Sequence, residues 1–123
     1  MTIKFKSIME QGGQKNNVEF VSEGTLTKEG NFDVYEFKEP QQGIMNRIEV
    51  SETAVNIFAG SSTINLELGN ILKTQYQTPA GIMYLNSLLI SVKKTKDKSN
   101  FEYTLSSGDN ELGRYNLTLT LNK

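Results

Sequence analysis

Residues 115 to 122 read Tyr115-Asn116-Leu117-Thr118-Leu119-Thr120-Leu121-Asn122, and every second side chain is apolar. In a β-strand successive side chains point to opposite faces, so this segment presents one apolar and one polar face. The alternation predicts a strand that buries one face and exposes the other. We therefore look for the same period of two in the rest of the chain.

The period recurs along most of the sequence. Phe101, Tyr103 and Leu105 repeat the design. Ile82, Tyr84, Leu88, Ile90 and Val92 share one parity, which predicts that they share one face of a long strand. Ile64, Leu66 and Leu68 also alternate with polar residues. Weaker alternation is found at Ile3–Phe5, Val18–Phe20, Phe32–Val34, Ile48–Val50 and Val55–Ile57. Glycine and asparagine separate many of these runs, as tight hairpins require. The polar stretch 11–17 predicts a mobile loop.

These runs predict an all-β fold of about eight to ten strands joined by short links. Parallel strands need crossover connections of about a dozen residues or more, and the sequence has no room for them. We therefore expect an antiparallel, up-and-down β-barrel that spans residues 1–123 as a single domain. Closure into a barrel removes exposed strand edges. A β-sandwich is the main alternative, although the Cys-Trp-Cys pattern of immunoglobulin domains is absent.

The composition excludes several kinds of chemistry. The chain of 123 residues has no Cys, no His and no Trp, and its formal net charge is −1. It therefore has no thiolate nucleophile and no imidazole base or metal ligand, and we expect no cofactor and no metal. A charge near zero gives little attraction to phosphate backbones, so we expect no nucleic-acid partner. No apolar run approaches the length of about 20 residues that spans a membrane. We expect a cytoplasmic protein without a signal peptide or a membrane partner.

Five residues are candidates for ligand contact. Arg47 and Arg114 are the only arginines, and either could hold a ligand carboxylate with two hydrogen bonds if it pointed into the barrel. Placement on the surface is the competing interpretation, and Arg47 has the opposite parity to Ile48. Tyr76, Tyr84 and Tyr103 could line a pocket with an apolar ring and a polar tip. Packing in the core or at the rim is the competing interpretation for these tyrosines.

No catalytic constellation is visible. Two carboxylate pairs, Glu49 with Glu52 and Asp109 with Glu111, are close only in sequence, and solvated turns explain them. Ser61-Ser62 follows Gly60 without a nucleophile elbow or a partner base. The basic run 93–98 holds four lysines at a predicted hairpin turn. It could form a charge patch for phosphates, or it could be a solvated strand edge.

One stretch adds a family resemblance. Tyr76-Gln77-Thr78-Pro79-Ala80-Gly81 runs into Met83, Leu85 and Leu89, and it follows an earlier layout of Tyr35-Glu36, Gly43, Ile48-Glu49-Val50 and Val55-Asn56-Ile57. From Ile3 onward the chain resembles the YwiB-like family of small bacterial proteins. The resemblance implies a calycin-type (lipocalin-like) β-barrel of unestablished function, and it carries over no catalytic residues.

Two classes of function remain open. A barrel of this size is either filled by side chains or holds one ligand, so the first is non-enzymatic binding of a small, partly apolar ligand. The second is an interaction or regulatory module with a solid barrel, whose surface binds another protein or a second copy of this chain. An enzyme would have to work with carboxylate, Tyr, Lys or Arg side chains alone, and a five-stranded OB-fold would have fewer strands than the pattern predicts.

Overall fold

Ten strands and no helix make up the described part of the chain in a computed structural model, which covers residues 1–60 and 62–122, apart from the side chains of residues 76–78. The strands are β1 (Thr2–Gln11), β2 (Gln14–Glu29), β3 (Phe32–Lys38), β4 (Met45–Val50), β5 (Ala54–Ala59), β6 (Ser62–Glu67), β7 (Ile71–Thr78), β8 (Gly81–Lys94), β9 (Lys98–Ser107) and β10 (Asn110–Asn122). Glycines and asparagines occupy many of the short connections, as the sequence predicted.

Each strand pairs with its neighbours in sequence, and the first strand pairs with the last. The order β6-β5-β4-β3-β2-β1-β10-β9-β8-β7 is antiparallel throughout. Beyond the end of β6, Leu68 forms a parallel bridge to Leu89 of β8, and the Gly69 amide donates to the Leu89 carbonyl at 3.2 Å. The predicted all-β, up-and-down barrel is therefore confirmed, and the ring of strands is nearly closed.

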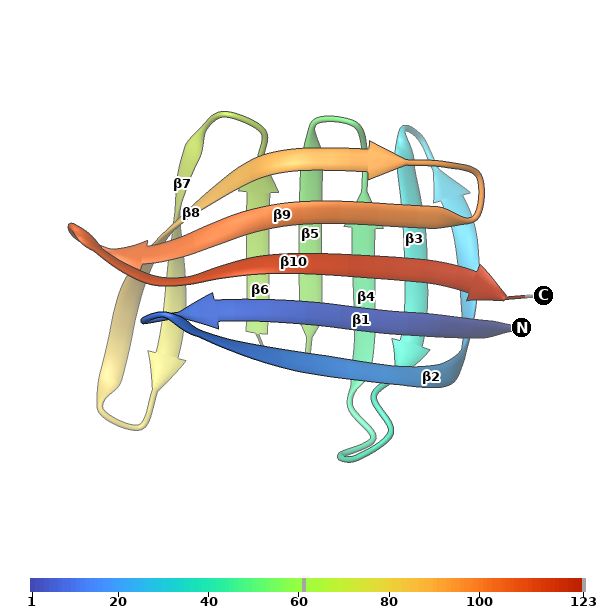
Figure 1. Cartoon of the computed structure of the whole chain (residues 1–123), viewed down its shortest axis with the longest axis horizontal. Helices are drawn as coiled ribbons and strands as arrows, with labels where there is room; N and C mark the ends of the chain where they lie inside the picture. Colours follow the sequence, from blue (N-terminus) through green and yellow to red (C-terminus); the bar gives the residue numbers. More distant parts are fainter. Residues whose placement is uncertain (61, 123) are drawn as a thin grey trace.

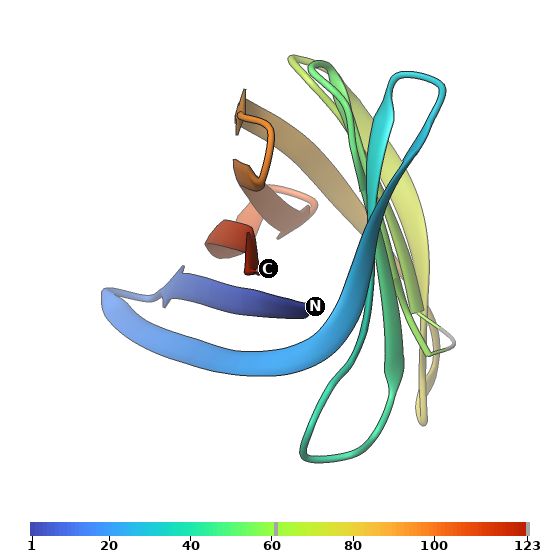
Figure 2. The same cartoon turned by 90° about the vertical axis from the view of Figure 1, so that its right-hand side faces the viewer.

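The barrel is flattened into two crossed layers, which explains why the sequence was compatible with both a barrel and a sandwich. β1, β9 and β10 run across the front of β3, β4, β5 and β6 (Figure 1). The long strand β2 curves from one layer into the other (Figure 2). Its residues 14–23 pair with β1, and its residues 24–29 pair with β3. Strands that bend between sheets form the corners of such packings.

β8 is irregular, and the predicted face of this strand is wrong over most of its length. The buried residues are Leu85, Ser87 and Leu89, whereas Tyr84 on the predicted face is 53% exposed. A bulge between Leu89 and Ser91 shifts the pairing with β9 by one residue. A bulge moves all later side chains to the other face, so the parity of β8 changes along the strand.

The two layers enclose a core that matches the predicted stripes of β9 and β10. Phe101, Tyr103, Leu105, Leu117 and Leu119 are buried, and they face residues from the other layer. The buried residues of that layer are Tyr35, Phe37, Ile48, Val50, Val55 and Leu66. Each aliphatic or aromatic side chain of this kind stabilises the fold by about 1.5–3 kcal/mol on burial.

Two polar links join the layers within this core. The Tyr35 hydroxyl on β3 and the Ser99 hydroxyl on β9 are 2.8 Å apart and buried. Lys94 of β8 places its ammonium 3.3 Å from the carboxylate of Asp33, whose side chain is 6% exposed. A buried carboxylate requires a partner of this kind, because an unpaired buried charge is strongly destabilising. We call this ion pair the Asp33–Lys94 clasp.

The β1–β2 hairpin corrects a second prediction. Residues 11–17 do not form a loop: β1 continues to Gln11, β2 begins at Gln14, and only Gly12 and Gly13 make the turn. Both glycines have positive φ, at 57° and 82°. Positive φ at both central residues is what a tight two-residue hairpin turn requires, and glycine adopts it without strain. Residues 14–23 of β2 therefore form a regular edge strand of the front layer, and β1 lies between this edge and β10.

Candidate functional site

Three phenylalanines come together on the inner face of the barrel beside β2. Phe5 of β1 and Phe20 of β2 are direct partners across the hairpin. Their rings stack with centroids 4.7 Å apart and an interplanar angle of 13°. Phe37 of β3 lies 5.9 Å from both rings in a tilted arrangement. The cluster forms an apolar, aromatic floor.

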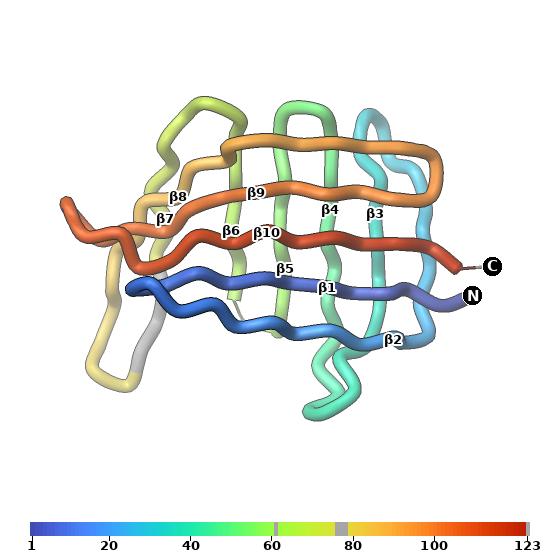
Figure 3. Tube along the Cα trace, in the orientation of Figure 1, coloured from blue at the N-terminus to red at the C-terminus, as the bar shows by residue number. Residues whose placement is uncertain are grey.

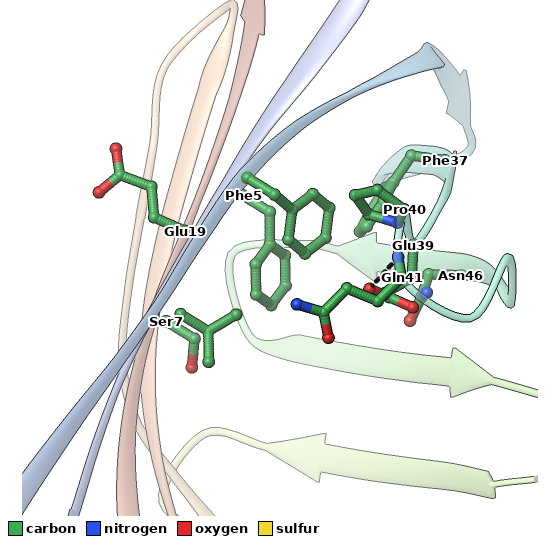
Figure 4. Close-up of a pocket in the computed structure, with 10 residues that line it drawn as sticks. Phe5, Ser7, Glu19, Phe37, Glu39, Pro40, Gln41 and Asn46 are labelled. Atoms are coloured by element: carbon green, nitrogen blue, oxygen red, sulfur yellow. Dashed lines mark hydrogen bonds between the residues drawn. The ribbon is translucent and has the colours of Figure 1, made fainter.

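Above this floor is an open pocket of about 440 Å³, which we call the mouth pocket. Its lining residues are Phe5, Ser7, Val18, Glu19, Phe20, Phe37, Glu39, Pro40, Gln41 and Asn46. Figure 4 shows Phe5 and Ser7 on one side and the segment from Glu39 to Gln41 on the other. Ser7 and Val18 face each other beside the aromatic pair, and their small side chains leave the space that forms the pocket.

The opening of the pocket follows the edge of β2. Residues 14–23 of β2 pair with β1 on one side, and no described strand pairs with their other edge. Val18 is 53% exposed although it shares the inner face with Phe20. A ligand could therefore reach the aromatic floor from solvent without any unfolding of the strands.

The β3–β4 connection forms the opposite wall and is held in one conformation by Glu39. The two carboxylate oxygens of Glu39 accept hydrogen bonds from the amides of Gln41, at 2.8 Å, and Gln42, at 2.7 Å. The main chain of the loop closes on itself, because the Glu39 amide donates to the Ile44 carbonyl at 2.8 Å. The other carboxylate of the lining, Glu19, pairs with Lys4 at 3.1 Å.

Both carboxylates of the pocket therefore already have partners, and none of its described lining residues is basic. The remaining polar groups are the Ser7 hydroxyl and the amides of Gln41 and Asn46. An aromatic floor with a few hydrogen-bonding groups at its rim suits a small, partly apolar molecule. Among the described residues, no group of three or more acidic side chains could hold a metal ion. No helix in this part of the chain has the length and apolar character needed to cross a membrane.

The sequence candidates lie elsewhere, and Arg47 is the clearest case. It lies on the outer face of β4, where its guanidinium contacts Glu49 and Glu29, both at 2.9 Å, and Glu36 at 3.6 Å. Hydrogen bonds to Glu49 and then Glu29 raise its pKa. Glu29 on β2 and Arg47 on β4 are on opposite sides of β3, so the Arg47 side chain reaches across that strand. Arg47 thus joins three strands, which corresponds to the surface placement weighed on the sequence.

The other candidates are also outside the mouth pocket. Tyr84 is on the outer face of β8, with the ammonium of Lys73 6.0 Å from its ring centroid. Arg114 is exposed on β10. Tyr103 is in the core, stacked on Tyr115 with centroids 4.9 Å apart. The side chain of Tyr76 lies outside the described residues. Sequence reasoning missed the phenylalanine cluster, because it treated the turn of the β1–β2 hairpin as a loop.

Tyr103 makes the stability of the barrel sensitive to alkali. Burial, with a smaller effect of Tyr115, raises the pKa of Tyr103 above the ordinary tyrosine value near 10. The unfolded chain loses this proton near pH 10, whereas the folded chain keeps it. The stability is therefore fully present below about pH 10 and falls above it, by about 1.4 kcal/mol per pH unit for this group.

We expect Tyr103→Phe to flatten this fall, measured as urea unfolding between about pH 9 and about pH 11. Burial also raises the pKa of Tyr35, so part of the slope will persist in the variant. Tyr84→Phe is the control, because Tyr84 is 53% exposed. An unchanged slope in Tyr103→Phe would contradict the role of this group.

The chain is similar to known proteins in its sequence and in its fold. Residues 3–119 match the family described as Domain of unknown function (DUF1934). A protein of Mycoplasmopsis pulmonis (strain UAB CTIP), described as "Uncharacterized protein", is 32% identical over 124 residues, which cover 98% of this chain and 98% of that protein. The crystal structure of ywiB protein from Bacillus subtilis matches with a TM-score of 0.75 at 19% identity, over 99% of this chain and 91% of that chain. The resemblance seen in the sequence is confirmed, and the structural match shows the shared barrel fold.

Proposed function

The chain belongs to the DUF1934 family, and from this premise we propose that it is a non-enzymatic binding protein that holds one small, partly apolar ligand in the mouth pocket. The observation that carries the proposal is the stacked Phe5–Phe20 pair beneath an open space of about 440 Å³. Small-molecule sites commonly have volumes of about 300–1,000 Å³ and mostly apolar linings. Elsewhere in the barrel large buried side chains fill the inner positions.

The residues that line the mouth pocket limit the kinds of ligand that it can hold. Aromatic rings favour a flat, apolar group that packs against the phenylalanine cluster. The Ser7 hydroxyl and the Asn46 amide can hydrogen-bond to one polar end of the ligand. Since no cation lines the pocket, a neutral ligand fits better than a carboxylate or a phosphate. The engagement of Glu39 and Glu19 with other groups supports binding rather than acid–base catalysis.

The test is to fill the pocket without changing the fold. Val18→Trp puts a large ring into the space beside Phe20, and Val21→Trp is a matched control on the same strand but the opposite face. The two valines are 53% and 55% exposed. With the neutral fluorescent probe N-phenyl-1-naphthylamine, we expect Val18→Trp to weaken binding about tenfold or more, because it removes the contacts to the aromatic floor. Val21→Trp should bind like the unsubstituted protein.

A thermal-shift screen complements the probe and covers fatty acids, isoprenoids, haem and flavins. Stabilisation by one of these compounds, lost in Val18→Trp and kept in Val21→Trp, would support the proposal. Equal probe binding by both variants would overturn it, since the probe would then be held elsewhere. Thermal unfolding of each variant without ligand establishes that the barrel is intact.

A surface interaction is a second candidate, favoured by the outer face of the β7–β8 hairpin. Ile71 is 69% exposed, Ile82 is 59% exposed and Tyr84 is 53% exposed. Grouped apolar side chains on a surface are typical of contacts with another protein or a second copy of the chain. Sedimentation velocity at rising protein concentration would detect self-association, and a monomer at every concentration would count against the second copy. The cysteine-free composition also leads us to infer a cytoplasmic location, which cell fractionation would test.

A further inference from the structure

A row of polar and basic residues crosses the outer face of the front layer, whereas the mouth pocket lies against its inner face. Lys93 on β8 is opposite Asn100 on β9, which is opposite Thr118 on β10, which is opposite Lys6 on β1. These four strands lie side by side, with the β8–β9 turn at one end (Figure 3). The row was not visible in the sequence, because its members come from four separate strands.

At the β8–β9 end of this row is a second pocket, of about 340 Å³. Its described lining residues are Lys93, Thr95, Lys98, Asn100 and Thr118, and this part of the chain gives it two ammonium groups and no carboxylate. Glu102 lies on the same face two residues further along β9, but it does not line the pocket. We call these five residues the lysine pocket.

The structure divides the basic run of the sequence between the two faces of β8. Lys94 turns inward to the Asp33–Lys94 clasp. Lys93 and Lys98 stay on the outer face and are exposed. Among the described residues, neither of these two ammonium groups lies within 4.0 Å of a carboxylate, whereas Lys4 on the same face is paired with Glu19. The positive charge of the lysine pocket is therefore not neutralised by an ion pair there.

Hydrogen bonds from the Asn100 side chain hold a neutral donor, the Thr118 hydroxyl, in the lysine pocket. The Asn100 side-chain amide donates to the Asn116 side-chain oxygen and to the Thr118 hydroxyl, both at 2.8 Å. It also donates to the Leu117 carbonyl at 3.3 Å. A hydroxyl that accepts a hydrogen bond still has its own proton to donate. Thr118 lines the pocket, and its hydroxyl keeps its own proton to donate.

We propose that the lysine pocket binds a phosphate group, either as a free phosphate or phosphomonoester or as a lipid headgroup. Two ammonium groups and the Thr118 hydroxyl supply donors from three side chains, and a phosphate has several oxygens that accept charge-assisted hydrogen bonds. A pocket with donors and no acidic lining favours a dianion over a neutral molecule. The site is separate from the mouth pocket, so it does not depend on the function proposed there.

The test is a titration with inorganic phosphate, followed by ¹H–¹⁵N NMR at constant ionic strength. We expect the amide signals of residues 93–100 and 118 to shift together, and the Asn100 side-chain amide to shift with them. Lys93→Gln/Lys98→Gln should weaken the phosphate affinity about tenfold or more, because two charge-assisted contacts are lost. Lys15→Gln/Lys38→Gln is the control, since it removes the same charge from other exposed lysines.

A second arm distinguishes the two sources of the phosphate. Co-sedimentation with phosphatidylglycerol vesicles that is absent in the Lys93→Gln/Lys98→Gln variant would assign the site to a headgroup. Phosphate binding without vesicle binding would assign it to a soluble phosphate compound. Equal phosphate affinity in both double variants, or no shift of the pocket signals in the unsubstituted protein, would overturn the proposal. Unfolding curves of the variants verify that the barrel is unchanged.

Discussion

Gly24→Ala should lower the free energy of unfolding by about 3 kcal/mol, because the corner of β2 has no room for a methyl group. A Cβ at Gly24 would lie 2.5 Å from the Glu36 carbonyl oxygen, 2.8 Å from Ile3 Cγ1 and 2.9 Å from Phe37 Cβ. The first of these is a main-chain atom of the paired strand, so it can move only if the β2–β3 ladder moves. Urea unfolding followed by circular dichroism measures the effect.

Gly113→Ala on β10 is the matched control for this substitution. The three atoms nearest to a Cβ there all belong to the Tyr115 side chain, at 3.2–3.3 Å. A side chain can rotate slightly to relieve such a contact, so we expect a loss of about 1 kcal/mol or less. If the two variants lost the same stability, the crowded corner at Gly24 would not be the cause. If Gly24→Ala fails to fold in buffer alone, unfolding of the same variant in added osmolyte extends the measurement to weaker stability.

Lys94→Met should lower the free energy of unfolding by about 3 kcal/mol, because it leaves the Asp33 carboxylate without its nearest cation. The Asp33 side chain is only 6% exposed, and Lys28, its other partner, is 3.7 Å away with a side chain that is 74% exposed. Water and Lys28 can therefore replace only a part of the lost interaction. Lys93→Met is the control: it is the preceding residue on the outer face, and we expect a change within about 0.5 kcal/mol.

A double variant tests whether the loss of stability comes from the interaction between Asp33 and Lys94. Asp33→Asn/Lys94→Met removes both charges of the clasp, and we expect it to recover most of the lost stability, since a buried pair is often replaceable by neutral groups. Chemical denaturation of the four proteins forms a double-mutant cycle. If the double variant were as unstable as the sum of the two single variants, Asp33 and Lys94 would not be acting on each other.

The fold could be predicted from the alternation of apolar and polar residues, because the apolar residues of a strand lie on the face that is buried. The stripes of β9 and β10 were correct because each strand is regular over its core residues and has one face in solvent. Alternation gave the wrong face for most of β8, because a bulge at Ile90 moves the later side chains to the other face of the strand. Nothing in the local sequence marks this bulge. The Asp33–Lys94 clasp was equally hidden, since a lysine inside a basic run gives no sign that it turns inward.

The sequence contained a signal for the Phe5–Phe20 pair of the candidate site, but the prediction did not use it. In a hairpin with a two-residue turn the register follows by counting outward from the turn. Counting outward from Gly12-Gly13 places Phe5 opposite Phe20 and Ser7 opposite Val18, as the structure has them. The third phenylalanine could not have been found in this way. Phe37 reaches the other two only because β2 bends at Gly24 and brings the second layer over the first.

The pairing of β1 with β10 determines when the barrel can be completed. All other ladders between the named strands join neighbours in sequence, but Glu10 and Arg114 are about a hundred residues apart. Hairpins form early because their loops are short, whereas closing a long loop has a larger entropic cost. During synthesis β3 to β6 can fold as each strand leaves the ribosome. The inner face of β1, with Ile3 and Phe5, stays without its β10 neighbour until the last strand has been made, so a chaperone would have its longest opportunity at this edge.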